Sequence, residues 1–182
     1  GFKIFDITTP SLPAVAGSIG FSAGVSAVDV WVANGYAYVV AGAFGLQIID
    51  VSNPRAPFGV SNISLGGNSA EALQVVGNYV YVAAQAGGIK IVDVTEKTNP
   101  FLAGGYTSPS LTHASGITVR GEILYVANGT GGDLQIFNIS NPINPVLLGS
   151  YTAPAGGNIS EVVLSGNYAY VAAGSAGLKI IN

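Results

Sequence analysis

The chain has 182 residues, of which 49% are hydrophobic and only 8% are charged, and its formal net charge is −3. Its six Lys and Arg residues are too few for a nucleic-acid-binding surface, which needs clustered positive charge, and they form no basic run for an anionic membrane. Cysteine is absent, which excludes disulfides, thiol nucleophiles and thiolate metal sites.

A short strand-like phrase begins the chain and recurs about every 44 residues, which is the length of one propeller blade. The phrase reads GFKIFDI at 1–7, GLQIIDV at 45–51, GIKIVDV at 88–94, DLQIFNI at 133–139 and GLKIIN at 177–182. We therefore treat 1–182 as a single domain with repeats at about 1–44, 45–87, 88–132 and 133–176 and the start of a fifth copy at 177–182.

Each repeat predicts four short strands. In one repeat, the run 70–76 leads through the turn Gly77-Asn78 into 79–84, and strands at 89–94 and 101–106 follow. Helical repeats are disfavoured, because the chain has 26 Gly residues and its apolar runs are rich in Val, Ile and Tyr. The predicted fold is an all-β β-propeller of four four-stranded blades, or part of a larger propeller.

The uncharged stretch 30–49 is long enough to suggest a transmembrane helix. We predict strands instead, because Asn34-Gly35 interrupts the stretch and the residues around this pair alternate as they do in strands. No transmembrane segment is expected.

Residues that recur at one place in every repeat are predicted to have structural roles. A tyrosine in the second strand indicates a packing ring between blades, formed by Tyr38, Tyr81, Tyr125 and Tyr170. An Asp or Asn closes the third strand just before a turn, where its side-chain oxygen can accept a backbone N–H; these residues are Asp6, Asp50, Asp93 and Asn138.

The strand count does not fit one closed ring. The third strand of the repeat occurs five times along the chain, whereas the other three strands occur four times each. Three interpretations stay open: the chain is part of a longer propeller with additional blades, two chains combine into a larger ring, or a four-bladed monomer closes with one strand left over.

Three stretches resemble the LVIVD repeat family, which is named for a hydrophobic strand that ends in Asp: LQIIDVSNP at 46–54, IKIVDV at 89–94 and LQIFNISNP at 134–142. Each follows a strand similar to G-N-Y-x-Y-V-A, and the resemblance covers nearly the whole chain. Asn138 departs from the pattern by replacing the Asp. The resemblance implies a surface or secreted β-propeller without catalytic residues common to the family.

Four ionisable residues are predicted near the loops that surround the mouth of a propeller channel: Asp29, Glu71, His113 and Glu161. Carboxylate oxygens suit hard cations, so these residues are candidates for a Ca²⁺ or polar-ligand site. The alternative, which we favour, is that they are unrelated polar residues facing water. No metal site and no cofactor other than this candidate Ca²⁺ is predicted, and a zinc site with several histidines is excluded because the chain has one His.

Two further features have a functional and a structural interpretation. Trp31 has no aromatic counterpart in the other repeats, so it is a candidate platform for stacking a sugar, although packing in the channel wall is the favoured interpretation. The N-x-S/T sequences at Asn62, Asn128 and Asn158 are candidate glycosylation sites, whereas the one at Asn138 is expected to be a turn cap.

These observations predict a non-enzymatic extracellular or cell-surface propeller that acts as a binding and assembly module for protein or glycan partners. One alternative is a structural subunit of a surface layer, sheath or filament, in which the low charge reflects subunit packing. Another is a hydrolase or lyase acting on a polar substrate at the channel mouth. No nucleic-acid partner is expected, and the unbalanced strand count allows for a homo-oligomer.

Overall fold

The structure is a computed structural model that describes residues 1–154 and 157–182. It consists of short β-strands and one 3-10 helix, η1 (Gly174–Ala176). Three sheets have four strands each. They are β3 (Asp29–Ala33), β4 (Tyr36–Val40), β5 (Leu46–Asp50) and β6 (Phe58–Ile63); β7 (Ala72–Val76), β8 (Tyr79–Ala83), β9 (Ile89–Asp93) and β10 (Phe101–Tyr106); and β11 (Ala114–Arg120), β12 (Ile123–Asn128), β13 (Asp133–Asn138) and β14 (Val146–Thr152).

Two smaller sheets lie at the ends of the chain. The first pairs β1 (Phe2–Asp6) with β2 (Ala14–Ile19), and the last contains β15 (Ile159–Ser165), β16 (Tyr168–Ala173) and β17 (Leu178–Ile181). A blade thus begins at β3, β7, β11 or β15, whereas the repeats defined from the sequence begin two strands away from a blade boundary, at β1, β5, β9 and β13.

Every sheet is an antiparallel meander in chain order, as predicted. The hairpin between β3 and β4 turns at Asn34 and Gly35, whose φ angles are 52° and 80°; this left-handed geometry suits a two-residue turn. The four strands predicted within 70–106 are confirmed as β7 to β10, to within two residues at each end. Local alternation and turn residues are therefore sufficient to define one blade.

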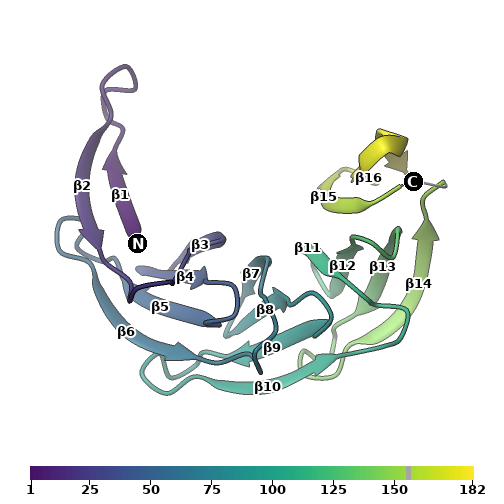
Figure 1. The fold of residues 1–182 in the computed structure, drawn as a ribbon, viewed down its shortest axis with the longest axis horizontal. Helices are drawn as coiled ribbons and strands as arrows, with labels where there is room; N and C mark the ends of the chain where they lie inside the picture. Colours follow the sequence, from purple (N-terminus) through teal and green to yellow (C-terminus); the bar gives the residue numbers. More distant parts are fainter. Residues whose placement is uncertain (155–156) are drawn as a thin grey trace.

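The sheets stand side by side along an arc (Figure 1). The first strands of the blades, β3, β7, β11 and β15, lie on its inner side and contact one another in succession, while β6, β10 and β14 run along the outside. This arrangement and the repeat pattern confirm a β-propeller architecture.

The hydrophobic core lies between adjacent sheets and does not extend through a common centre. Tyr38, Leu46 and Ile48 of one sheet pack against Leu73 and Val82 of the next. Equivalent layers join the following sheets. Tyr38 and Tyr81 are buried in these layers and Tyr125 is half-buried, so the predicted tyrosine ring is present there.

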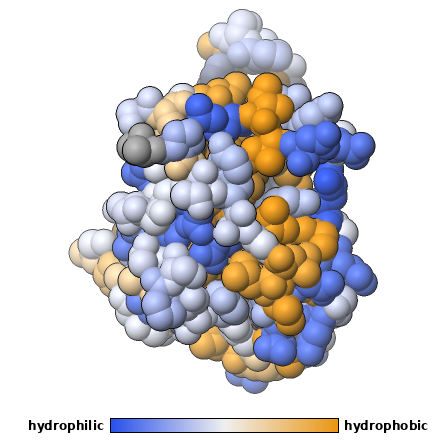
Figure 2. Space-filling view, turned by 90° about the vertical axis from the view of Figure 1, so that its right-hand side faces the viewer, coloured by the Kyte–Doolittle hydropathy of each residue, from blue (hydrophilic) through white to orange (hydrophobic). Residues whose placement is uncertain are grey.

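The arc is open. Strand β1 pairs with β2 and strand β17 with β16, and within residues 1–154 and 157–182 no ladder joins the first sheet to the last. The structure therefore does not have the four-bladed closed ring that was one of the three interpretations. Tyr170 is exposed, unlike its equivalents, because no sheet covers the outer face of β16. Figure 2 shows apolar side chains gathered in patches on the side of the molecule that carries this sheet.

The predicted turn caps are confirmed. The Oδ1 atoms of Asp50 and Asn138 each accept the backbone N–H of the residue two positions later, at 2.9 and 2.8 Å, and the hydroxyl of the same residue. Asp6 makes the same pair of bonds, and Asp93 accepts the backbone bond. The bonds from the Ser52 hydroxyl and backbone N–H lower the pKa of Asp50.

The one helix among the described residues, η1, has three residues and is far too short to cross a membrane.

Candidate functional site in the channel and at the seam between blades

The inner strands β3, β7, β11 and β15 line a cavity of about 530 Å³ on the inner side of the arc. Side chains in one register position, Trp31, Gln74, Thr118 and Val163, are among its lining residues. The repeat thus places one variable side chain from each blade on the wall of one cavity.

Polar side chains on this wall connect each inner strand to the next. Asp29 Oδ2 accepts the backbone N–H of Leu73 at 2.9 Å. The Gln74 amide bonds both to the N–H of Val119, at 2.7 Å, and to its carbonyl. The Thr118 hydroxyl donates to the carbonyl of Val162 at 2.7 Å. These bonds replace a backbone ladder between blades and fix the spacing of the inner strands.

Asp29 and Glu161 both line the cavity, from its first and last inner strands. Partial desolvation raises the pKa of Glu161, and the negative charge of Asp29 adds to this effect, while a bond from the Val162 N–H opposes it. The second oxygen of Asp29 accepts the N–H of Val30 at 2.8 Å, so both of its oxygens hold backbone groups.

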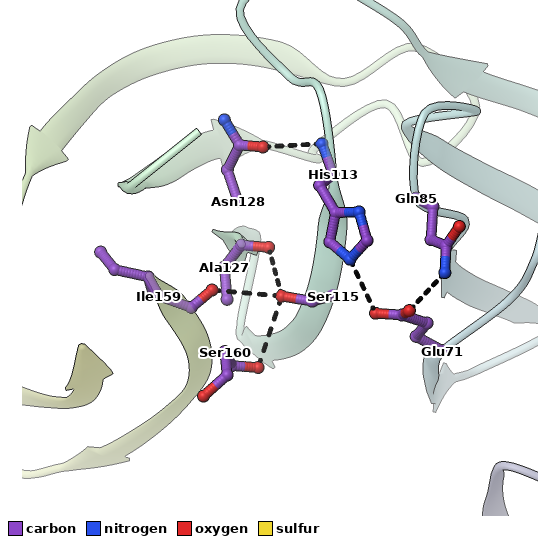
Figure 3. Close-up of polar contacts among 8 residues, drawn as sticks. All are labelled: Glu71, Gln85, His113, Ser115, Ala127, Asn128, Ile159 and Ser160. Atoms are coloured by element: carbon purple, nitrogen blue, oxygen red, sulfur yellow. Dashed lines mark hydrogen bonds and ion pairs between the residues drawn. The ribbon is translucent and has the colours of Figure 1, made fainter. Parts of the chain in front are cut away.

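Glu71 and His113 meet at the seam between the second and third complete sheets (Figure 3). The Nε2 atom of His113 lies 3.4 Å from Glu71 Oε2, and both side chains are partly exposed. The amide of Gln85 donates a hydrogen bond to the other carboxylate oxygen of Glu71. The result is a carboxylate held between an imidazole and an amide, which forms an ion pair when His113 is protonated.

Asn128 positions the backbone of His113. Its Oδ1 atom accepts the His113 N–H at 2.9 Å, and its amide group donates to the carbonyl of Ser110 and to Asp133. Asn128 is fully buried, and Gln135 is buried beside it and donates to the same two residues. A polar cluster thus supports the loop that carries the only histidine of the chain.

The sequence analysis did not identify Gln85 and Asn128 as part of this site, although each interrupts the repeat pattern. Gln85 stands where the other repeats have Gly42, Gly129 and Gly174, and its φ angle of 45° is rare for a residue with a side chain. Asn128 stands where the other repeats have Ala41, Ala84 and Ala173. A polar residue in a position otherwise kept small is the signal that could have revealed both.

Of the four predicted ionisable residues, Glu71 pairs with His113 at the seam, while Asp29 and Glu161 line the cavity. Within the described parts of the chain, no three His, Asp or Glu residues lie close enough to hold a metal ion. The candidate Ca²⁺ site stays a prediction.

Trp31 lines the cavity and keeps 38% of its surface exposed, so it does not pack fully into the wall. Of the candidate glycosylation sites, Asn62 and Asn158 are exposed. Asn128 is buried and hydrogen-bonded through both ends of its amide, so a glycan cannot be attached there in the folded chain.

Comparison with known protein families identifies the repeat. The model of the LVIVD repeat matches residues 24–64, 66–108, 112–153 and 156–182. The chain belongs to the LVIVD repeat family. Each complete LVIVD match contains the four strands of one sheet, and the last contains β15 to β17. No curated protein matches the chain.

Solved structures similar to this LVIVD-repeat chain have low sequence identity. The β-propeller domain of Cps50 (Swd1) from Myceliophteria thermophila is 12% identical, with a TM-score of 0.75, over 98% of this chain and 62% of that one. BamB from Moraxella catarrhalis is 14% identical, with a TM-score of 0.68, over 88% of this chain and 48% of that one. The computationally designed Ika4 protein is 12% identical, with a TM-score of 0.66, over 87% of this chain and 91% of that one.

These similarities concern the fold alone. The chain spans less than two thirds of the length of the Swd1 and BamB chains and nearly all of Ika4.

Proposed function

We propose that this chain is a non-enzymatic binding module located at the cell surface or outside the cell, and that its channel binds a glycan through Trp31. The repeat fold supports a scaffold that carries variable side chains on a constant frame. The observation that carries the proposal is an exposed indole on the wall of a 530 Å³ cavity.

The residues beside Trp31 have the chemistry that sugar recognition requires. An indole offers an apolar face to the C–H side of a sugar ring, and a few polar groups fix the orientation of the hydroxyls. The cavity provides a carboxylate from Glu161 and a guanidinium from Arg120. The Gln74 amide and the Thr118 hydroxyl also line it and keep hydrogen-bonding capacity beyond their bonds to the neighbouring strands. Both signs of charge and neutral donors are present, which suits a hydroxyl-rich ligand better than a highly charged one.

The seam residues support binding or structure more than catalysis. Ser115 lies two residues from His113, but its hydroxyl lies within hydrogen-bonding distance of the carbonyls of Ala127 and Ile159, both at 3.2 Å, as Figure 3 shows. A serine nucleophile would need its hydroxyl directed at the imidazole. Within the described residues, His113 is paired with Glu71 instead.

Glycan binding can be measured directly, because Trp31 is the only tryptophan of the chain. The labelled protein is screened on a glycan array, and each hit is titrated while the indole fluorescence is recorded. We expect saturable quenching or a blue shift, and loss of binding in Trp31→Ala. Phe44→Ala is the matched control, since Phe44 is another exposed aromatic residue but does not line the cavity.

Hits that bind Trp31→Ala as tightly as the unchanged chain would contradict the proposed site. Turnover of a bound glycan would contradict the non-enzymatic assignment. An array without hits, together with a protein ligand whose binding depends on Trp31, would replace the glycan by a protein partner.

A further inference from the structure

The last sheet of the arc has an uncovered apolar face. Tyr170 of β16 is exposed, although its equivalents Tyr38 and Tyr81 pack between sheets. The sequence of this sheet is therefore suited to a neighbour that the arc itself does not supply.

The other end of the arc, at β3, exposes the surface that a preceding blade would cover. Val30 is 47% exposed, whereas its equivalent Leu73 is 3% exposed beneath the preceding blade. Val30, Val32, Phe2 and Ile4 line an apolar groove of about 390 Å³, at the place where the first two strands of a preceding blade would lie.

We infer that two copies of this chain join through these ends and close one ring, with β15 and β16 of each copy pairing with β1 and β2 of the other. The second copy is the occupant that the molecule itself indicates, because both halves of the missing seam are present on the same chain. This inference is independent of the proposed glycan site, but it completes the wall of the channel in which that site lies.

The internal seams serve as the template for the contact. At the first complete seam, Tyr38 packs against a layer that includes Leu73 of the next sheet. Tyr170 and Val30 occupy the same two repeat positions, so Tyr170 of one copy packs over Val30 of the other. Apart from Lys3, the residues that line the groove are uncharged, and their burial is favourable by about 25 cal/mol for each Å² of apolar surface.

The new blade needs only one of β1 and β17, because both occupy the third position of a four-stranded sheet. Strand β1 is retained, since Phe2 packs on the cluster of Ala37, Val39 and Ile49 and β2 covers its outer edge. Strand β17 has no such partner on its outer edge and is released. By analogy with the pairing of Tyr38 and Ile48, Tyr170 of one copy then faces Ile4 of the other.

Light scattering after size exclusion tests the closed pair. We expect a sharp species at twice the 18.3 kDa of one chain. Tyr170→Glu should convert it to a monomer without loss of β structure in circular dichroism, because this side chain is exposed within one arc. Val146→Glu is the matched control: Val146 is an exposed apolar residue on β14, away from both ends, and its replacement should leave the pair intact.

A disulfide trap tests the register. The chain has no cysteine, so the variant with both Ile4→Cys and Tyr170→Cys should form a covalent dimer under mild oxidation, while either single replacement should give much less. If the unchanged chain stays monomeric, the inference is wrong, and the two exposed faces would instead be covered by further blades of a longer protein. A polydisperse series of higher assemblies would also overturn it, because the ends would then join without closing a ring.

Discussion

The amide of Gln85 donates a hydrogen bond to Glu71 from a backbone position that is glycine in the other three repeats. Its φ angle of 45° lies in the left-handed region, which costs a residue with a side chain about 1–2 kcal/mol. The same Glu71 carboxylate contacts His113 on its other oxygen. Gln85 is therefore a strained residue that orients the Glu71 carboxylate beside the only histidine of the chain. This is the clearest departure of the chain from its own repeat pattern.

Replacement of Gln85 separates the strain from the hydrogen bond. Gln85→Ala keeps the unfavourable φ and loses the bond to Glu71, whereas Gln85→Gly loses the bond but relieves the strain. We expect the alanine variant to be less stable than the glycine variant by about 1 kcal/mol in urea unfolding. Gly42→Ala, at the equivalent position with a φ of 55°, should lose a similar amount; equal stability of the two Gln85 variants would contradict the strain.

The contribution of burial between sheets to stability can be measured by making the same substitution at equivalent positions of two repeats. Leu46 and Leu178 occupy the same position, but Leu46 is fully buried and Leu178 is largely exposed. Leu46→Ala should cost about 2–5 kcal/mol in free energy of unfolding, and Leu178→Ala less than about 0.5 kcal/mol. A large loss in the second variant would show that the last sheet is covered in solution by a neighbour that retains β17.

Alkaline pH should unfold the chain through its buried tyrosines. Burial raises the pKa of Tyr81 to about 12 from an ordinary value near 10, because the charged phenolate is disfavoured between sheets. The unfolded chain then loses the proton first, so stability is complete below pH 10 and falls as the pH rises toward 12. Tyr81→Phe should reduce this fall in denaturant unfolding at pH 8 to 11.

The control for this titration is Tyr168→Phe, since Tyr168 is an exposed tyrosine of the equivalent strand in the last sheet. It should leave the alkaline loss of stability unchanged. The same loss in Tyr81→Phe as in the original chain would assign the effect to other groups.

Acid pH should weaken the turn after β5. Hydrogen bonds from Ser52 lower the pKa of Asp50, so the ionised form stabilises the folded state above pH 4 and this contribution is lost as the pH falls through the lowered value. Asp50→Asn should keep the cap and remove its contribution to the pH dependence, because Asn138 makes the same two bonds in another repeat. Melting temperatures between pH 2 and 6 test this; identical slopes would contradict it.

Much of the site was not predictable from single residues. Asp29, Glu71, His113 and Glu161 were expected near one channel mouth because their places in the repeat are close. A shift of one to three positions along the chain changes the face or the height of a side chain, so repeat positions alone did not reveal that Glu71 and His113 contact each other. Gln85 joins them from a different loop, which its Gly-like position could have indicated.

The repeat itself was determined by the sequence. Alternating apolar residues, Asn34-Gly35 and Gly77-Asn78 turns, and the caps at Asp50 and Asn138 act within a few residues of one another, so local physics is enough to specify each four-stranded sheet. Only the tertiary structure decided how the sheets are placed. Contacts between residues of different blades determine the curvature of the arc, the pairing of Glu71 with His113 and the exposure of Leu178. These contacts depend on side-chain packing between sheets, which cannot be predicted from a local sequence pattern.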